Sequence, residues 1–300
     1  MNATRTALGY GIRGALTGLG LVAGLGGVAF AGLLRQAKAA SVRIEADAIA
    51  GAVADGWISA ADRSGLTSAG DLPVPAADGW YLSDGAFTTD RASGAMTLAM
   101  LGDSTSVGYG CRLPDQVPGT LLARGVAAAT GRPVRLVTHG LVGCGAADLP
   151  RQLALALPEA PDVVVINIGA NDIRDKVPPW QSAARLGEAV AALRAQRIPV
   201  VVGTCPDFGV IAPIPQPLRS VLGTWSRSLA ALQNKDVTAA GGRAVSISKL
   251  VSPAFNGHPE LFSPDRFHPS APGYVKAADA LLPVVLTALT EDAQQPANVA

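Results

Sequence analysis

The chain of 300 residues contains little of several residue types, and each shortage narrows the range of functions. Its 24 basic and 23 acidic side chains nearly cancel, so it has no basic excess for binding a nucleic-acid backbone. Aromatic residues make up 5% of the chain, too few for a series of base-stacking platforms. Three cysteines do not make a disulfide-rich scaffold, and a chain of this length can bury a core without one. Because 49% of residues are hydrophobic and only 16% are charged, we expect a folded protein.

A long hydrophobic run lies near the N-terminus, where residues 14–34 include no charged side chain. As a helix this run would extend about 31 Å, close to the hydrocarbon thickness of a bilayer. Two interpretations are open: an uncleaved transmembrane anchor, or a signal peptide cleaved near Ala37-Lys38-Ala39. The length of the run favours the anchor. Basic residues flank both ends, so charge does not settle the orientation. Either interpretation predicts a domain on the extracytoplasmic side, membrane-anchored or secreted.

The composition changes along the chain and predicts four segments. Residues 1–40 form the anchor or signal segment. Residues 41–95 are rich in Gly, Asp, Ser and Pro after an Ala-rich start, which predicts a linker or arm packing on the main domain. Residues 96–290 are expected to form the main domain, and residues 291–300 a flexible tail.

Within the main domain, short apolar runs alternate with amphipathic stretches. The runs, expected to be strands, are residues 96–101, 133–138, 162–168, 198–204 and 243–248. The expected helices are residues 119–130, 146–156, 181–196, 217–240 and 271–289. This alternation predicts an α/β fold: a three-layer α/β/α sandwich around a five-stranded, mainly parallel, doubly wound sheet. In such sheets the ligand site lies beyond the carboxyl ends of the strands.

Small and polar residues follow the first two expected strands. Ser104 lies in the turn Gly102-Asp103-Ser104, which leads from the first strand toward a helix. Backbone N–H groups exposed there suit a nucleophile whose carbonyl target becomes an oxyanion, although Ser and Asp are also ordinary helix caps. The second strand is followed by the turn GLVGCG, in which the N–H of Gly143 is the candidate oxyanion donor. Gly140 takes that place if the turn is shifted.

Two further motifs, GAND and DRFH, supply a side-chain amide and an acid–base pair. Asn171 follows the third strand in the sequence GAND, and Asp265 and His268 precede the last helix in DRFH. Histidine accepts a serine proton near neutral pH, and a carboxylate orients it and stabilises its cationic form. Asp and His three residues apart can meet on one loop turn. Of the other histidines, His139 precedes the glycine turn and is expected to point into the strand layer. His258 has no carboxylate in a comparable motif, although Glu260 is near.

With these four motifs in this order, the chain resembles the SGNH hydrolases, also called the GDSL-type esterase/lipase family. The matching positions are Ser104 in GDS, Gly143, Asn171 in GAND and His268 in DRFH. The resemblance covers about residues 96–290. The general character of the sequence is similar to that of membrane-anchored or secreted actinobacterial members of the family. It implies a flavodoxin-like sandwich and a serine esterase. Thr105 departs from the family pattern, which has Leu there; we expect this to affect packing rather than chemistry.

The resemblance also implies a role for each residue. Ser104 would attack an ester carbonyl, His268 would act as general base and Asp265 would orient His268. The oxyanion would be held by the N–H groups of Ser104 and Gly143 and by the side chain of Asn171. No metal or other cofactor and no nucleic-acid partner is expected, and the oligomeric state cannot be read from the sequence.

The expected substrates are carboxylic esters, especially short-chain acyl or acetyl esters of lipids or glycans. We expect loops 206–217 and 255–264 to form an apolar acyl-binding rim. An O-acyltransferase acting on a cell-envelope glycan or lipid would use the same residues, and a catalytically silent envelope protein would retain the same fold. These two alternatives therefore stay open.

The three cysteines lie near the ends of the expected strands. Cys111 and Cys144 follow the turns of Ser104 and Gly143, so both are expected near the rim of the site. A disulfide between them is one option, subject to the strict geometry of that bond. Cys205, at the end of the fourth strand, is expected to be buried and inert.

Overall fold

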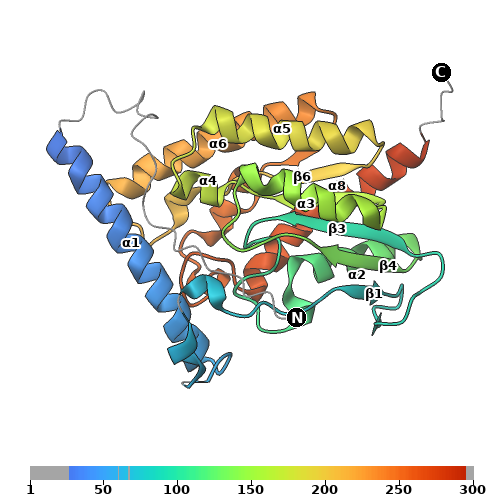
Figure 1. Cartoon of the computed structure of the whole chain (residues 1–300), viewed down its shortest axis with the longest axis horizontal. Coiled ribbons are helices and arrows are strands. Elements are labelled where there is room, and N and C mark those ends of the chain that lie inside the picture. Colours follow the sequence, from blue (N-terminus) through green and yellow to red (C-terminus); the bar gives the residue numbers. More distant parts are fainter. Residues whose placement is uncertain (1–26, 60, 67, 295–300) are drawn as a thin grey trace, which may run out of the picture.

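The structure, a computed structural model, describes residues 27–59, 61–66 and 68–294. A seven-stranded sheet lies between two layers of helices (Figure 1). In sheet order the strands are β2 (Phe87–Thr88), β1 (Gly79–Tyr81), β4 (Val134–Thr138), β3 (Met96–Gly102), β5 (Val163–Asn167), β6 (Val200–Gly203) and β7 (Arg243–Val245). The strands from β4 to β7 are parallel, whereas β1 and β2 are antiparallel at one edge.

Each of the five parallel strands lies within or next to an expected run, and their order is that of a flavodoxin-like sheet. The expected end of the last run at residue 248 is wrong, because β7 ends at Val245 and a helix begins at Ile247. The expected number of five strands is wrong, because β1 and β2 extend the sheet to seven. These two strands are three and two residues long, too short to show a period of two. β1 is a strand because it pairs with the edge strand β4, where Tyr81 lies opposite Val134, and β2 pairs in turn with β1.

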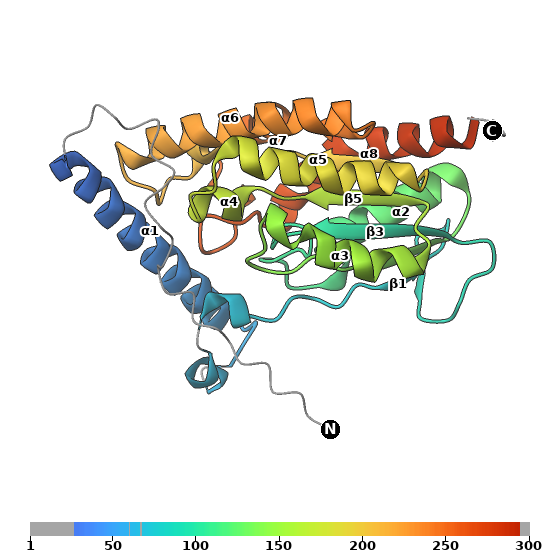
Figure 2. The same cartoon turned by 45° about the horizontal axis from the view of Figure 1, so that its top comes forward.

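Helices cover both faces of the sheet. They are α1 (Gly27–Ala54), α2 (Pro118–Thr130), α3 (Leu149–Ala156), α4 (Ala170–Arg174), α5 (Pro179–Ala195), α6 (Leu218–Ala239), α7 (Ile247–Leu250) and α8 (Ala271–Gln294). Short 3-10 helices occupy residues Asp62–Gly65, Ala69–Asp71, Pro114–Gln116, Ala146–Asp148, Leu157–Glu159, Phe208–Val210, Ser252–Phe255 and Pro259–Leu261. α2 and α8 pack on one face, and α3, α5 and α6 on the other (Figure 2). α1 lies against one end of the sandwich (Figure 1).

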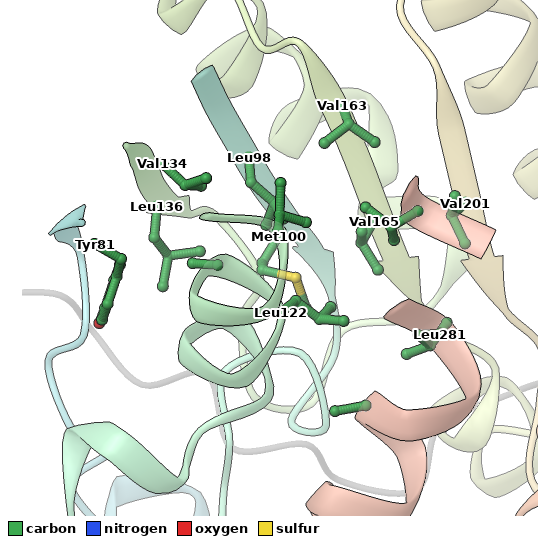
Figure 3. Close-up of a cluster of buried hydrophobic side chains, with 14 of the residues drawn as sticks. Tyr81, Leu98, Met100, Leu122, Val134, Leu136, Val163, Val165, Val201 and Leu281 are labelled. Atoms are coloured by element: carbon green, nitrogen blue, oxygen red, sulfur yellow. The ribbon is translucent and has the colours of Figure 1, made fainter. Parts of the chain in front are cut away.

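The core consists of two apolar layers, one on each face of the sheet. Successive side chains of a strand point to opposite faces. Leu98 and Met100 of β3 therefore pack with Leu122 of α2, whereas Ala99 and Leu101 pack beneath α3 and α5. Figure 3 shows the first of these layers. Burial on both faces explains why the parallel strands are almost continuously hydrophobic.

Two segments bear on the expected membrane helix. Most of the run at residues 14–34 lies outside the described residues, and only its last part is described, as the start of α1. Within the described part of the chain, Ala271–Glu291 of α8 is the one stretch with the length and composition of a membrane span. Tyr274, Leu281 and Val285 of this helix are buried in the core, so packing on the sheet accounts for its apolar face.

Replacing Leu122 by Ala should remove core packing between α2 and the sheet. Leu122 is fully buried, so we expect a loss of about 2–5 kcal/mol in the free energy of unfolding, measured by urea titration. Leu155→Ala is the matched control, because Leu155 lies on α3 with its side chain exposed. That variant should stay within about 0.5 kcal/mol of the wild type. Equal losses in the two variants would contradict the assigned core.

Candidate active site

Ser104 lies in the turn that directly follows β3. Gly102, the last residue of β3, has a φ of 123°, and an added Cβ there would lie 1.9 Å from the carbonyl oxygen of Asn167. Only glycine fits this close approach. Asp103 then accepts hydrogen bonds from the N–H and the hydroxyl of Thr105, at 2.9 and 2.7 Å. Burial raises the pKa of Asp103, and the bonds from Thr105 oppose that rise. Asp103 therefore closes the turn that presents Ser104.

A chain of hydrogen bonds joins Ser104 to the loop before α8. Ser104 Oγ lies 3.0 Å from His268 Nε2, and His268 Nδ1 lies 2.6 Å from Asp265 Oδ2. The other carboxylate oxygen accepts hydrogen bonds from the Ser263 hydroxyl and from the N–H groups of Phe267 and His268. The structure thus brings Ser104 to Asp265 and His268, although more than 150 residues separate it from them in the sequence.

The environment of Asp265 favours its ionised form. Its side chain is 1% exposed, and burial by itself would raise the pKa of the carboxyl group. The charge of His268 and the hydrogen bonds from His268, Ser263 and Phe267 outweigh burial, so the pKa lies below its ordinary value. An ionised Asp265 can hold the imidazole in one orientation and stabilise its protonated form.

In the glycine-rich turn after β4, the backbone N–H groups of Val142 and Gly143 have no hydrogen-bond partner among the described residues. Gly143 has a φ of 85°, and within the described residues neither its N–H nor that of Ser104 donates a hydrogen bond to another protein group. The N–H of Gly140, in contrast, donates to the carbonyl of Met100 at 3.2 Å. Gly143 is therefore the glycine of this pair with an available donor.

Asn171 and its neighbour hold this turn against the start of α4. The Asn171 side-chain amide donates to the carbonyl of Cys144 at 2.8 Å, which leaves its second amide hydrogen for another acceptor. The Asp172 carboxylate accepts a hydrogen bond from the N–H of Ala146 at 3.1 Å. Burial raises the pKa of Asp172, while the bond from Ala146 opposes that rise. The turn that carries Gly143 is thus fixed from α4.

Two buried glutamines support the strand ends, and the sequence analysis missed them. The Gln152 side chain accepts the N–H of Gly102 at 2.6 Å and donates to its carbonyl at 2.9 Å. Gln233 accepts the N–H of Cys205 at 2.7 Å and donates to the carbonyl of Ile168 at 3.0 Å. A glutamine on the apolar face of an amphipathic helix is the sequence signal that could have revealed both.

All three cysteines are free thiols, so the suggested bond between Cys111 and Cys144 is not formed. Burial raises the pKa of Cys111 to about 12 and that of Cys144 to about 11. Cys205 is fully buried, as expected. Thiols with such raised pKa values stay protonated near neutral pH and are poor nucleophiles. In the described part of the chain, no group of three or more His, Cys, Asp or Glu side chains is arranged to hold a metal ion.

An apolar cavity opens beside Ser104 and His268. About 910 Å³ of space, including the part open to solvent, lies between its lining side chains. Both loops expected to form an apolar rim contribute to it. Its apolar lining includes Phe208, Val210, Ile211, Phe255, Phe262 and Phe267.

A flavodoxin-like sandwich with a Ser–His–Asp chain at the carboxyl edge of its sheet is the arrangement of the SGNH hydrolases. The profile of the GDSL-like lipase/acylhydrolase family matches residues 100–276, more than half of the chain. The protein belongs to this family.

Individual relatives agree with this assignment. The GDSL-like esterase Rv1075c of Mycobacterium tuberculosis is 47% identical over 206 residues, covering 66% of this chain and 64% of that protein. The chain therefore aligns with slightly less than two thirds of that relative. Phospholipase A1 from Streptomyces albidoflavus NA297 aligns with a TM-score of 0.51 at 19% identity, covering 65% of this chain and 99% of that one. A variant of the acetyl-xylooligosaccharide esterase Axe2 from Geobacillus stearothermophilus gives 0.51 at 17% identity, covering 65% and 95%. At sequence identities of 17% and 19%, the similarity to these two structures shows a shared fold alone.

Replacing Asp265 by Asn should change how stability depends on pH. Because the pKa of Asp265 is lowered in the folded state, its ionised form stabilises the fold above the ordinary aspartate pKa of about 4. This contribution is lost as the pH falls through the folded pKa. We expect Asp265→Asn to be less stable than the wild type by about 1–3 kcal/mol near neutral pH, with a smaller difference in acid.

Urea titrations of both proteins from neutral to acidic pH measure this difference. Asp279→Asn is the control, because Asp279 is exposed on α8, and it should stay within about 0.5 kcal/mol of the wild type near neutral pH. A difference for Asp265→Asn that is the same at every pH would contradict the electrostatic account.

Proposed function

We propose that the protein is a carboxylic ester hydrolase with Ser104 as its nucleophile. The observation that carries this proposal is the hydrogen-bonded chain from Ser104 through His268 to Asp265, beside a cavity. His268 Nε2 takes the proton as Ser104 Oγ attacks the ester carbonyl, and Asp265 stabilises the resulting imidazolium. His268 then protonates the leaving alcohol. Water, activated in the same way, releases the acyl group from Ser104.

The proposed oxyanion site has three donors. These are the backbone N–H groups of Ser104 and Gly143 and the second amide hydrogen of Asn171. Its support is the absence of other partners for the two N–H groups within the described residues, and the tether from Asn171 to Cys144. Donors held in place before the reaction stabilise the developing negative charge without reorganisation.

We assign the apolar cavity to the acyl part of the substrate. Its lining of phenylalanine and aliphatic side chains favours a hydrocarbon group over a charged one. The proposed substrates are short-chain acyl or acetyl esters of lipids or glycans. An ester series from acetate to octanoate measures which chain length the cavity accepts.

We also propose that the protein works on the outer side of the cytoplasmic membrane. The support is the charge-free run at residues 14–34. The run holds the chain in the membrane if it is retained, and the domain is secreted if cleavage occurs near Ala39.

Hydrolysis of p-nitrophenyl esters tests the roles of Ser104 and Asn171. Ser104→Ala should lower the rate about 10⁴-fold or more, because the nucleophilic hydroxyl is lost and only the oxyanion donors and substrate binding still contribute. Asn171→Ala should lower kcat about 10²–10³-fold with little change in KM, because its donor acts mainly in the transition state. Asn256→Ala, a change at an exposed asparagine, is the control and should leave kcat near the wild-type value.

The outcomes separate the assignments. Near-wild-type turnover in Ser104→Ala would remove Ser104 as the nucleophile, and near-wild-type turnover in Asn171→Ala would remove Asn171 from the oxyanion site. A folded wild type that hydrolyses none of the esters would contradict the esterase proposal. It would favour the acyltransferase or the catalytically silent protein.

Fractionation of cells that express the full chain tests the location. A retained anchor predicts a full-length protein that stays in the membrane fraction after carbonate washing. A cleaved signal predicts a soluble protein outside the cytoplasm whose N-terminus lies near residue 40. A full-length, soluble protein in the cytoplasm would contradict both forms of the proposal.

A further inference from the structure

Tyr109 contacts both the nucleophile turn and the base. Its ring centroid lies 4.4 Å from that of His268, and its backbone N–H donates to the carbonyl of Ser104 at 2.9 Å. The side chain is 3% exposed, and its hydroxyl donates to the carbonyl of Ala69 at 2.8 Å. Tyr109 thus links Ser104 and His268 to a segment of the chain that precedes the sheet.

The C-terminal half of α1 packs against Tyr109. Ala48 and Ala52 are buried in one cluster with the tyrosine, and Trp57 meets the Tyr109 ring edge-on with 6.3 Å between centroids. Glu45 of α1 accepts a hydrogen bond from the N–H of Ala69 at 3.2 Å. The residue that anchors the Tyr109 hydroxyl is therefore itself held by α1.

α1 also packs directly on the loop that carries Asp265. A Cβ added at Gly51 would lie 2.1 Å from Cβ of Pro264 and 2.7 Å from its Cγ. Pro264 precedes Asp265, so the helix and the loop approach as closely as a glycine allows. Gly32, on the same helix, has no atom within 4 Å of an added Cβ.

We propose that α1 from Glu45 to Ala54, together with Trp57 and Ala69, is a positioning support for the Ser–His–Asp chain. It fixes the Asp265 loop through Gly51 and Pro264, and it fixes Tyr109, whose ring limits the rotation of His268. Gly51 and Tyr109 act through these neighbours. For its activity readout this inference rests on the proposed esterase function. A displacement of about 1 Å in such a site can lower turnover about 10²-fold.

A glycine-to-alanine pair on α1 tests the contact with Pro264. In the full-length protein, Gly51→Ala should lower kcat for p-nitrophenyl butyrate about 10- to 100-fold, with KM changed less than about twofold. Gly32→Ala should leave both constants unchanged. The two substitutions raise helix propensity alike, so their difference isolates the contact at position 51. A folded Gly51→Ala protein with wild-type kcat would overturn the proposal.

Second changes at Pro264 distinguish displacement of the loop from a general loss of folding. Gly51→Ala with Pro264→Gly removes the colliding Cβ, and the nearest remaining atom of residue 264 is Cα, at 3.5 Å. We expect this pair to recover most of the lost kcat. Gly51→Ala with Pro264→Ala keeps a Cβ and should not recover it. Equal activity of the two double variants, with thermal unfolding showing that both are folded, would overturn the proposal.

The signals of ¹⁵N-labelled histidine give a readout that needs no substrate. The chain has three histidines, so the His268 ring signals can be assigned by their loss in His268→Asn. Tyr109→Leu should shift these signals and lower kcat, whereas Tyr109→Phe, which keeps the ring, should preserve both. A folded Tyr109→Leu protein with unchanged His268 signals would overturn the role of Tyr109. If the wild type hydrolyses no ester, the proposed function fails while these signals still test the support.

Discussion

The parallel pairing of β3 with β4 on one side and β5 on the other is the constraint on which the site depends. Parallel neighbours end at the same edge of a sheet, so the turns that carry Ser104, Gly143 and Asn171 lie together. The register pairs Gly102 with Asn167, and the two backbones approach so closely that residue 102 has no room for a side chain. The position of Ser104 is therefore set by strand pairing before any side chain of the site contributes.

Buried polar side chains make that edge rigid. Backbone groups at strand ends lose their ladder partners, and a buried group without a partner is costly. Gln152 satisfies both backbone groups of Gly102, while Asp172 and Asn171 bind the backbone of the turn that carries Gly143. The same bonds that satisfy the backbone also hold the candidate donors in fixed positions, which is what electrostatic stabilisation of an oxyanion requires.

The remaining parts of the site come from distant parts of the chain. His268 and Asp265 come from the loop before α8, and the carboxylate oxygens of Asp265 accept four hydrogen bonds, from Ser263, Phe267 and two groups of His268. α1 reaches the same loop from the N-terminal side, where Gly51 contacts Pro264. Asp265 and His268 are therefore held by the loop before α8 near the C-terminus and by α1 near the N-terminus.

The parallel strands can be predicted from local sequence, because strands buried on both faces must be nearly all apolar. Ser104, Asp265 and His268 can be nominated in the same way, because their types and places match one chemistry. Other features depend on contacts between distant residues and are visible only in the folded chain. β1 and β2 are strands because β4 offers an edge. Gly140 is excluded as the donor because its N–H binds the carbonyl of Met100, whereas the N–H of Gly143 has no partner among the described residues. Tyr109 and Gly51 matter through partners far along the chain, which a local sequence pattern does not identify.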